Sequence, residues 1–430
     1  MSLSKNTAWN LIGTGTPFLV GLATIPYLIK HIGVESFGIL TLIWTLIGYF
    51  SLFDLGLGRA LTQQVASCIA TKRLERLPSL VKSGLVFTGW TGLIGGLLLA
   101  VLSQPLGHSW LKVSSSLQHD TACSLLIAAL GIPLTTVTTG LRGVIEAYED
   151  FRGSNILRIS LGIANFALPA LSVMFFGPSL ILIVVTLILA RVVIFVAHIR
   201  LMNTKLPAGW FKKEANSKDV KNLLTFGVWM TVSNIISPLM VTADRFIISA
   251  TLGAGLVAYY TVPFEILIRV LILPAALTSA LFPRLATLFH AEDSTAAKSL
   301  YYRSLKIVTI TLLPICLIIT LGSYYGLTLW LGKDFAEHSW IIVCILTVGI
   351  FLNGIAYVPF SAIQATGNAK ITAYFHILEL CIYIPLLLLA LRLFGLYGAA
   401  IVWTIRIALD LSLLLFFAKK LISSHKGFVR

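Results

Sequence analysis

Charged side chains are scarce in this chain of 430 residues. Asp, Glu, Lys and Arg together make up 11% of it, whereas a soluble globular domain carries about 25%. Hydrophobic residues make up 57%, and the mean hydropathy is +0.92. A chain of this length with so little charge cannot cover a surface that faces water, so its apolar surface must face lipid.

Signatures of catalysis, metal binding and cross-linking are also missing. The sequence has no Walker loop, no G-x-S-x-G, no H-E-x-x-H and no C-x-x-C pair among its five cysteines. Its eight histidines are scattered. We therefore expect no enzymatic activity, no catalytic residues, no cofactor, no metal site and no disulfide framework.

Long apolar runs recur along the whole chain, and about 20 apolar residues span a bilayer as a helix. The runs are continuous rather than alternating, which favours helices over a barrel. The sequence thus predicts an all-α, polytopic membrane protein with about twelve transmembrane helices. The predicted spans cover residues 8–29, 38–57, 80–103, 122–145, 156–176, 179–199, 223–245, 257–279, 304–324, 340–361, 372–391 and 397–418.

The two halves of the chain resemble each other. At a shift of 220 residues, Ile32-Gly33 falls on Leu252-Gly253, and at a shift of 218, Phe176-Gly177 falls on Phe394-Gly395. Matches in order at a nearly constant offset indicate duplication, although chance similarity between apolar spans is the alternative. We expect a six-helix lobe over 1–200, a basic cytoplasmic linker over 201–222, a second six-helix lobe over 223–418 and a basic tail over 419–430.

The excess of basic residues, 32 Lys and Arg against 17 Asp and Glu, first suggests a nucleic-acid partner. Their positions argue against one. With both termini inside, most of the basic residues lie in cytoplasmic segments, which is the positive-inside asymmetry. The residues that fall outside are Lys30, Lys112, Lys333 and Arg392. The charge therefore sets the orientation and meets the headgroups of membrane lipids.

Ten charged residues interrupt the apolar spans. A charge at the centre of a bilayer costs roughly 2.5–3.5 kcal/mol on insertion scales, so such residues face a cavity or a partner. Some are expected to be structural ion pairs, and Arg59 has the alternative of snorkelling to the interface. His376 lies near Glu379 and is a candidate for a proton relay, although a lone histidine is more often simply packed. The ten are Asp54, Arg59, Arg191, Asp244, Arg245, Glu265, Arg269, Glu379, Arg406 and Asp410.

Several short motifs are distributed along both halves of the chain. They are Asn6–Asn10, Pro26–Leu28, Ile32–Gly38, Phe53–Leu57, Arg59–Thr62, Asp244–Ile248, Leu252-Gly253 and Tyr259-Tyr260. Together they resemble the motifs of the Wzx-type O-antigen flippases, bacterial polysaccharide transporters within the superfamily of multidrug, oligosaccharidyl-lipid and polysaccharide exporters. The resemblance covers nearly the whole chain, and its motifs are specific in combination rather than singly.

The resemblance implies two lobes around a central cavity that opens alternately to each side of the bacterial inner membrane. The implied substrate is an undecaprenyl-diphosphate-linked oligosaccharide repeat unit of O-antigen or a related surface polysaccharide. It would move from the cytoplasmic to the periplasmic leaflet, coupled to an ion gradient. Membrane lipids and other polysaccharide assembly proteins are the implied partners. By motif, the resemblance extends to Asp54, Arg59, Asp244 and Arg245.

Burial and chemistry extend these assignments. A diphosphate cannot cross hydrocarbon uncompensated, and arginine matches phosphate with two donors. We therefore expect arginines to bind substrate and acidic groups beside them to couple to ions. The predicted substrate-binding residues are Arg59, Arg245, Arg269 and Arg406. The predicted ion-coupling residues are Asp54, Asp244, Glu265, Glu379 and Asp410.

Three other functions are compatible with a polytopic chain. A drug/cation antiporter of the same superfamily would need acidic groups to dominate its cavity, whereas the buried acids here are balanced by arginines. A membrane polymerase or ligase acting on the same glycan typically needs a large outer loop, and the segment 104–121, about the longest outer one, is short. A structural scaffold would have no use for buried charges.

Overall fold

The computed structural model describes residues 3–50, 57–70, 72–148, 150–207, 209–214, 216, 242–290, 294–366 and 369–424. Almost all of these residues are helical, and the described ranges contain no strand. The chain separates into two compact units, Met1–Thr242 (unit 1) and Ala243–Arg430 (unit 2). The predicted lobe and linker boundaries stay predictions, because residues 217–241 lie outside the described part.

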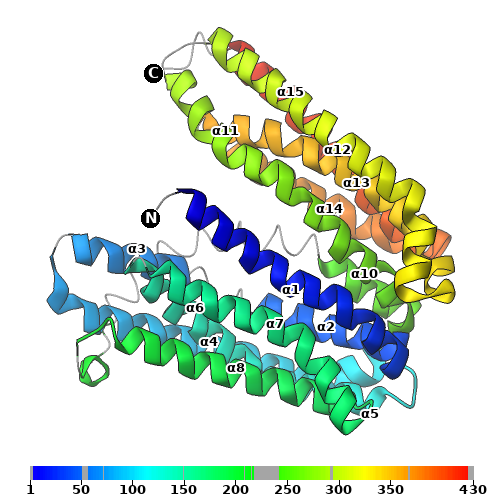
Figure 1. Cartoon of the computed structure of the whole chain (residues 1–430), viewed down its shortest axis with the longest axis horizontal. Helices are drawn as coiled ribbons and strands as arrows, with labels where there is room; N and C mark the ends of the chain where they lie inside the picture. Colours follow the sequence, from blue (N-terminus) through cyan, green and yellow to red (C-terminus); the bar gives the residue numbers. More distant parts are fainter. Residues whose placement is uncertain are drawn as a thin grey trace. The chain divides into compact units, whose positions relative to one another are not determined.

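Unit 1 is a bundle of antiparallel helices. Figure 1 shows α1 beside α7, α4 beside α6, and α8 along α6 and α7, and these pairs are in contact. The helices are α1 (Leu3–Ile32), α2 (Val34–Phe50), α3 (Leu57–Ala70), α4 (Leu77–Pro105), α5 (Gln118–Ala129), α6 (Gly131–Ala147), α7 (Phe151–Phe176) and α8 (Leu180–Asn203).

Unit 2 is built around α13, which packs on α10, α11, α12 and α15, with α14 laid along α15. Residues 242–252 form the helix that opens it. The elements that follow are η5 (Ala254–Leu256), α10 (Val257–Leu267), η6 (Ile268–Leu271), α11 (Ile272–His290), α12 (Ser294–Leu331), α13 (Lys333–Ala365), α14 (Ala369–Phe394) and α15 (Leu396–Ser424).

The glycines that match between the two halves of the sequence occupy matching turns. Gly33 and Gly253 have φ of 82° and 106°, and Gly177 and Gly395 have φ of 82° and 56°. Residues with side chains rarely adopt positive φ, so each pair ends a helix in a way that favours glycine. The same device at corresponding places supports the predicted pseudo-repeat.

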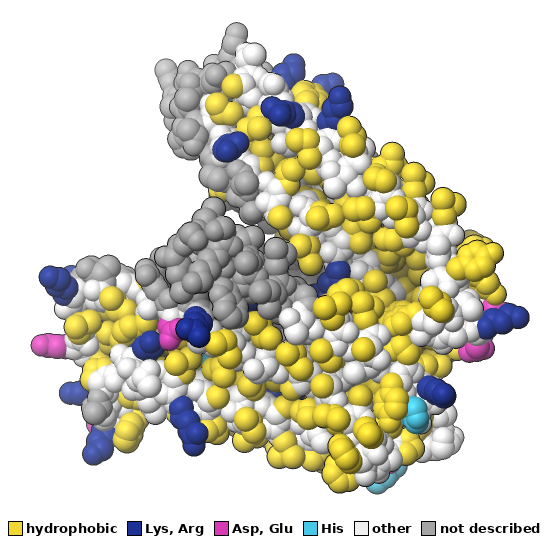
Figure 2. Space-filling view, in the orientation of Figure 1, with side chains coloured by type: hydrophobic (Ala, Val, Ile, Leu, Met, Phe, Trp, Pro, Cys, Tyr) yellow, Lys and Arg dark blue, Asp and Glu magenta, His cyan; other side chains and the backbone are white. Residues whose placement is uncertain are grey.

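Nine helices within the described ranges are long and apolar enough to cross a membrane. Their outward faces carry large hydrophobic side chains such as Leu321 and Leu329 of α12 and Val193 of α8. Figure 2 shows hydrophobic side chains over the visible face of each unit and Lys and Arg mostly toward its margins. This distribution confirms the predicted all-α, polytopic membrane protein.

Several helix boundaries differ from the predicted spans. The span 38–57 is a helix that ends at Phe50, followed by a separate helix that begins at Leu57. The span 122–145 is interrupted for one residue at Leu130, whose dihedral angles stay helical, since Pro133 has no N–H for the carbonyl four residues earlier. Within 257–279, η6 interrupts the α-helix just before Pro274. Of 223–245, residues 223–241 lie outside the described part.

Candidate functional site

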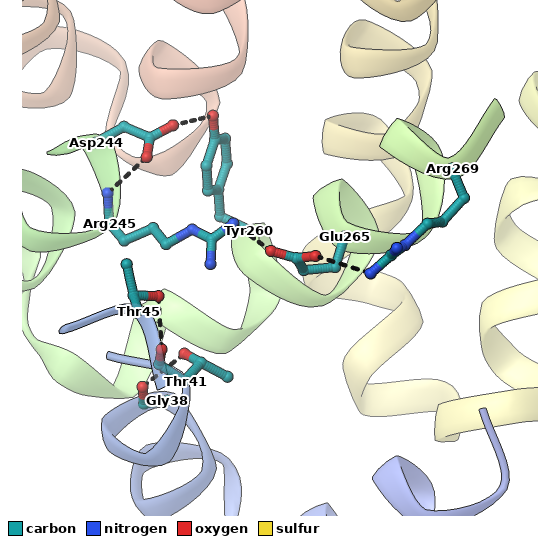
Figure 3. Close-up of polar contacts among 8 residues, drawn as sticks. All are labelled: Gly38, Thr41, Thr45, Asp244, Arg245, Tyr260, Glu265 and Arg269. Carbon is teal, nitrogen blue, oxygen red and sulfur yellow. Dashed lines mark hydrogen bonds and ion pairs between the residues drawn. The ribbon is translucent and has the colours of Figure 1, made fainter. Parts of the chain in front are cut away.

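Two predicted site residues cannot be placed. Asp54 lies outside the described residues, and of Arg59 only the backbone, near the start of α3, is described. Near the middle of unit 1, the hydroxyls of Thr41 and Thr45 donate to the carbonyls of Gly38 and Thr41, both at 2.7 Å (Figure 3). These buried hydroxyls are thus satisfied within α2. The other predicted site residues all lie in unit 2.

Glu265 of α10 lies between two arginines. Arg245 Nη2 donates to Glu265 Oε1 at 2.5 Å, and Arg269 Nη2 lies 3.9 Å from Glu265 Oε2 (Figure 3). The Arg245 side chain is 7% exposed, whereas those of Glu265 and Arg269 are 45% and 40% exposed. We call these three residues the arginine clamp. It gathers guanidinium groups around one carboxylate and leaves an open side on which a second anion could approach.

The local fold explains how the clamp forms. Gly253 makes the turn that returns the chain, so that α10 can lie against the helix of residues 242–252. Pro263 lies inside α10 and offers no N–H to the carbonyl of Tyr259. Ser339 Oγ of α13 donates to that carbonyl at 3.0 Å instead. The kinked helix is thereby held on α13, and its last turn presents Glu265 to the arginines.

Asp244 is fully buried beside the clamp. One carboxylate oxygen accepts from the Tyr260 hydroxyl at 2.7 Å, and the other accepts from the Arg245 backbone N–H at 2.8 Å (Figure 3). A buried carboxylate needs such donors to offset its lost hydration. Asp244 therefore holds the Arg245 backbone N–H and the Tyr260 hydroxyl, and it lies next to the clamp.

A second group of polar side chains lies between α14 and α15. Glu379 and Arg406 are buried, and the Glu379 and Asp410 carboxyl groups interact electrostatically. The Arg406 guanidinium lies over the ring of Tyr383, 5.5 Å from its centroid. We call these four residues the carboxyl pair cluster. Two neighbouring carboxyl groups repel each other when both are ionised, so the pair is a place where a proton can be held.

Close packing of α15 on α13 positions Arg406 and Asp410. A Cβ at Gly349 would collide with the ring of Trp403, so only a glycine lets the two helices approach this closely. Trp403 is fully buried there, and Thr404 Oγ1 donates to the Ile345 carbonyl at 3.1 Å. Arg406 and Asp410 follow Trp403 within two turns of α15.

The two groups are electrostatically connected within unit 2. Asp244 interacts with the charge of Arg406, and Tyr383 with the charge of Asp244. Together they hold three guanidinium groups and four carboxyl groups, so cationic and acidic side chains are nearly balanced in number. The prediction that arginines balance the buried acids therefore agrees with this arrangement.

The prediction from the sequence did not include two tyrosines that contact charged groups, or the contact between Arg245 and Glu265. The i, i+4 spacing indicated that Glu265 and Arg269 share a face, but it could not reveal the shorter contact of Glu265 with Arg245. Tyr260 and Tyr383 were not singled out as partners of charge. A tyrosine beside an intramembrane acid is the signal that could have found them, because its hydroxyl is a donor available in an apolar helix.

Unit 1 carries ion pairs near the end of α6, the start of α7 and the end of α8. The predicted pair of Arg142 and Glu146 is confirmed, with Nε 2.6 Å from Oε1. Lys205 Nζ lies 2.9 Å from Asp150 Oδ2. Hydrogen bonds from Lys205 and from the Gly153 N–H hold the pKa of Asp150 below its ordinary value.

The fold matches solved structures of membrane transporters. A MATE family transporter of the MOP superfamily in an inward-facing conformation gives a TM-score of 0.81 at 14% identity, with 96% of each chain covered. An outward-facing MATE transporter gives 0.64 at 15% identity, with 97% of this chain and 94% of that chain covered. The chain is a multi-pass membrane protein with the MATE transporter fold.

Sequence relatives narrow this class. The family described as "Polysaccharide biosynthesis protein" matches residues 3–289. A "Putative O-antigen transporter" of Shigella flexneri is 35% identical over 428 residues, which cover 99% of this chain and 100% of that protein. The "Uncharacterized membrane protein EpsK" of Bacillus subtilis is 23% identical over 390 residues, which cover 86% of this chain and 73% of that protein. The chain therefore belongs to the polysaccharide biosynthesis protein family, which confirms the predicted resemblance.

Proposed function

We propose that this protein is a flippase for undecaprenyl-diphosphate-linked oligosaccharide repeat units of O-antigen or a related surface polysaccharide. It would carry them from the cytoplasmic to the periplasmic leaflet of the inner membrane by alternating access, without catalysing a reaction. The observation that carries this proposal is the 35% identity, over the full length of both chains, with a relative named as an O-antigen transporter. Both termini are proposed to lie in the cytoplasm.

The arginine clamp suits the charged part of such a substrate. A diphosphate is costly to bring into hydrocarbon unless cations and hydrogen-bond donors replace its water. Arg245 and Arg269 offer two planar groups of donors around the half-exposed Glu265. In this proposal they bind the diphosphate, with Arg406 and Arg59 as further cationic contacts.

The carboxyl pair cluster suits the coupling ion. In this proposal Glu379 and Asp410 share one proton, beside Arg406 and within electrostatic range of His376. Loss of that proton adds a negative charge near the arginines and so weakens their hold on an anionic substrate. Proton binding and substrate binding would thus favour each other. Asp244 and Glu265 are proposed to take part through their contacts with Arg245.

The test is complementation of a bacterial strain that lacks its own flippase. We expect Arg245→Ala, Arg269→Ala and the double variant to lower surface glycan at least tenfold, because anion binding is lost. Arg392→Ala is the matched control, since Arg392 is exposed near the end of α14 in the same unit. Protein abundance in the membrane is measured alongside. Normal glycan display by the double variant would contradict the proposed role of the clamp.

A drug/cation antiporter is the second candidate, because the fold is that of multidrug MATE transporters. It predicts that expression of the chain raises resistance to cationic drugs and leaves surface glycan unchanged. The near balance of buried arginines and acids in unit 2 favours the flippase.

A further inference from the structure

Arg191 is a buried cation in the middle of unit 1. It lies near the centre of the 24-residue helix α8, so roughly 16–18 Å of helix axis separate it from either end. That distance exceeds the reach of an arginine side chain, and snorkelling to the interface is excluded. Arg191 is only 8% exposed and packs among α8, α5 and α6.

The guanidinium group of Arg191 has no acidic partner within the described part of the chain. Its Nη1 donates to the Leu187 carbonyl at 3.1 Å, and that oxygen also serves the hydrogen-bond ladder of its own helix. The ion pairs of the described residues involve other side chains, and no charged group among these residues acts on Arg191. The other two arginines that are buried in the described part of the chain differ: Arg245 has Glu265, and Arg406 interacts with the carboxyl pair.

The stem of Arg191 packs against the start of α6. A Cβ at Gly131, the first residue of α6, would lie 3.5 Å from Arg191 Cδ, an ordinary van der Waals distance, and 2.7 Å from Ile188 Cδ1. A buried cation is expensive unless something compensates it. A buried cation whose described neighbours supply no anion points to an anion that arrives from elsewhere.

We propose that Arg191 binds an anionic group of the transported substrate, either a phosphate of the lipid carrier or a carboxylate of an acidic sugar. This inference rests on the proposed function and adds a contact within unit 1 to the clamp in unit 2. The competing explanation is structural: the cation stabilises the carboxyl end of α5 where the helix breaks. The two differ in what they predict for the protein without ligand.

The experiment measures thermal unfolding of the purified full chain in detergent, with and without added anions. The probes are farnesyl diphosphate, uncharged farnesol and glucuronate. The Arg245→Ala/Arg269→Ala double variant serves as the background, so that binding at the clamp does not mask binding at Arg191. Arg191→Gln is added to this background, and Arg200→Gln is the matched control because Arg200 is exposed near the end of the same helix.

We expect the background and the Arg200→Gln variant to gain several degrees in Tm with farnesyl diphosphate or with glucuronate, and none with farnesol. A gain in Tm with farnesyl diphosphate would identify the phosphate of the lipid carrier as the ligand, and a gain with glucuronate would identify an acidic sugar. Arg191→Gln abolishes the gain and, without ligand, melts no lower than its background, because it removes an uncompensated buried charge.

An unchanged gain in Arg191→Gln, no gain with either anion in the background, or a lower Tm of the ligand-free variant would overturn the proposal. Failure of the flippase function itself is distinguishable, since it would show as normal surface glycan when the clamp is removed. Loss of glycan in the clamp variants together with an anion gain unaffected by Arg191→Gln rejects only the site in unit 1.

Discussion

Individual charged residues of this protein are held by specific donors, and Asp150 shows how one of them responds to pH. It lies outside the membrane spans and caps α7, where its carboxylate accepts from the Gly153 N–H at 3.0 Å and lies 2.9 Å from Lys205 Nζ. These contacts lower its pKa when the chain is folded. The contribution to stability is thus present above the unfolded pKa of about 4 and lost as the pH falls through the folded pKa.

We predict that Asp150→Asn lowers the stability of the folded chain at pH 7 by up to about 1 kcal/mol, the value typical of a partly exposed pair. Asparagine also caps helices, so the change isolates the charge. Thermal unfolding of both proteins from pH 7 down to pH 2.5 measures the difference, which should shrink as the pH falls. Arg200→Gln, a change at an exposed arginine near the end of α8, should behave like the unaltered chain. A difference that stays constant over this pH range would exclude the ionic explanation.

The types of the site residues could be predicted at this scale, but their pairing could not. Intramembrane charge alone singled out Arg245, Glu265, Glu379 and Asp410. Which acid meets which arginine depends on contacts between helices that are distant in sequence, such as the 20 residues between Arg245 and Glu265. Helical periodicity relates only residues that are about one turn apart. It therefore predicted the longer Glu265–Arg269 contact and could not predict the shorter Glu265–Arg245 contact.

Helix α10 illustrates how an element is shaped by a missing donor. Pro263 leaves the Tyr259 carbonyl without its helical partner, and Ser339 of α13 replaces it. A buried carbonyl left without a hydrogen bond costs about 1–3 kcal/mol. The serine therefore stabilises the kink that presents Glu265 to the arginine clamp.

We predict that Ser339→Ala destabilises the protein by about 1–3 kcal/mol and reduces glycan display, because α10 loses its attachment to α13. Pro263→Ala restores an N–H, so in that background Ser339→Ala should cost markedly less. Thermal unfolding of the four proteins in this double-mutant cycle gives the coupling. Ser412→Ala is the control, since this exposed hydroxyl bonds only to a carbonyl of its own helix. Equal costs in both backgrounds would disprove the link between the serine and the proline.

Most helices could be predicted because hydrophobic runs of bilayer length leave few alternatives. The breaks could not be placed, since a proline in a span often only kinks it. Pro133 coincides with a one-residue interruption at Leu130, whereas the 38-residue helix α12 continues through Pro314. Whether a helix breaks depends on what its neighbours offer to the freed carbonyl, which hydropathy does not encode.

At the scale of the whole molecule, the charge distribution predicts orientation. Glu75 lies in a basic segment beside Arg73 and Arg76, whereas Ser115 lies in the longest predicted outer segment, and both residues are exposed. The positive-inside rule places the first in the cytoplasm and the second outside.

We predict that a cysteine at Ser115 reacts with a membrane-impermeant maleimide in intact spheroplasts, and that a cysteine at Glu75 reacts only after permeabilisation. The background replaces the five native cysteines by alanine. Surface glycan is measured first, so that only functional variants are labelled. The reverse labelling pattern would contradict the proposed topology and the proposed direction of transport.

Glu265 has a consequence for turnover. Because the Glu265 carboxylate lies against Arg245 and Arg269, the proposed diphosphate would compete with an anion that belongs to the same unit and never diffuses away. A transporter that binds its substrate too tightly releases it slowly. An acidic side chain that competes for the same arginines lowers the net free energy of substrate binding and so speeds release. When the substrate dissociates, Glu265 pairs with the arginines again. The substrate-free protein can then return to its starting conformation without unpaired cations in the bilayer.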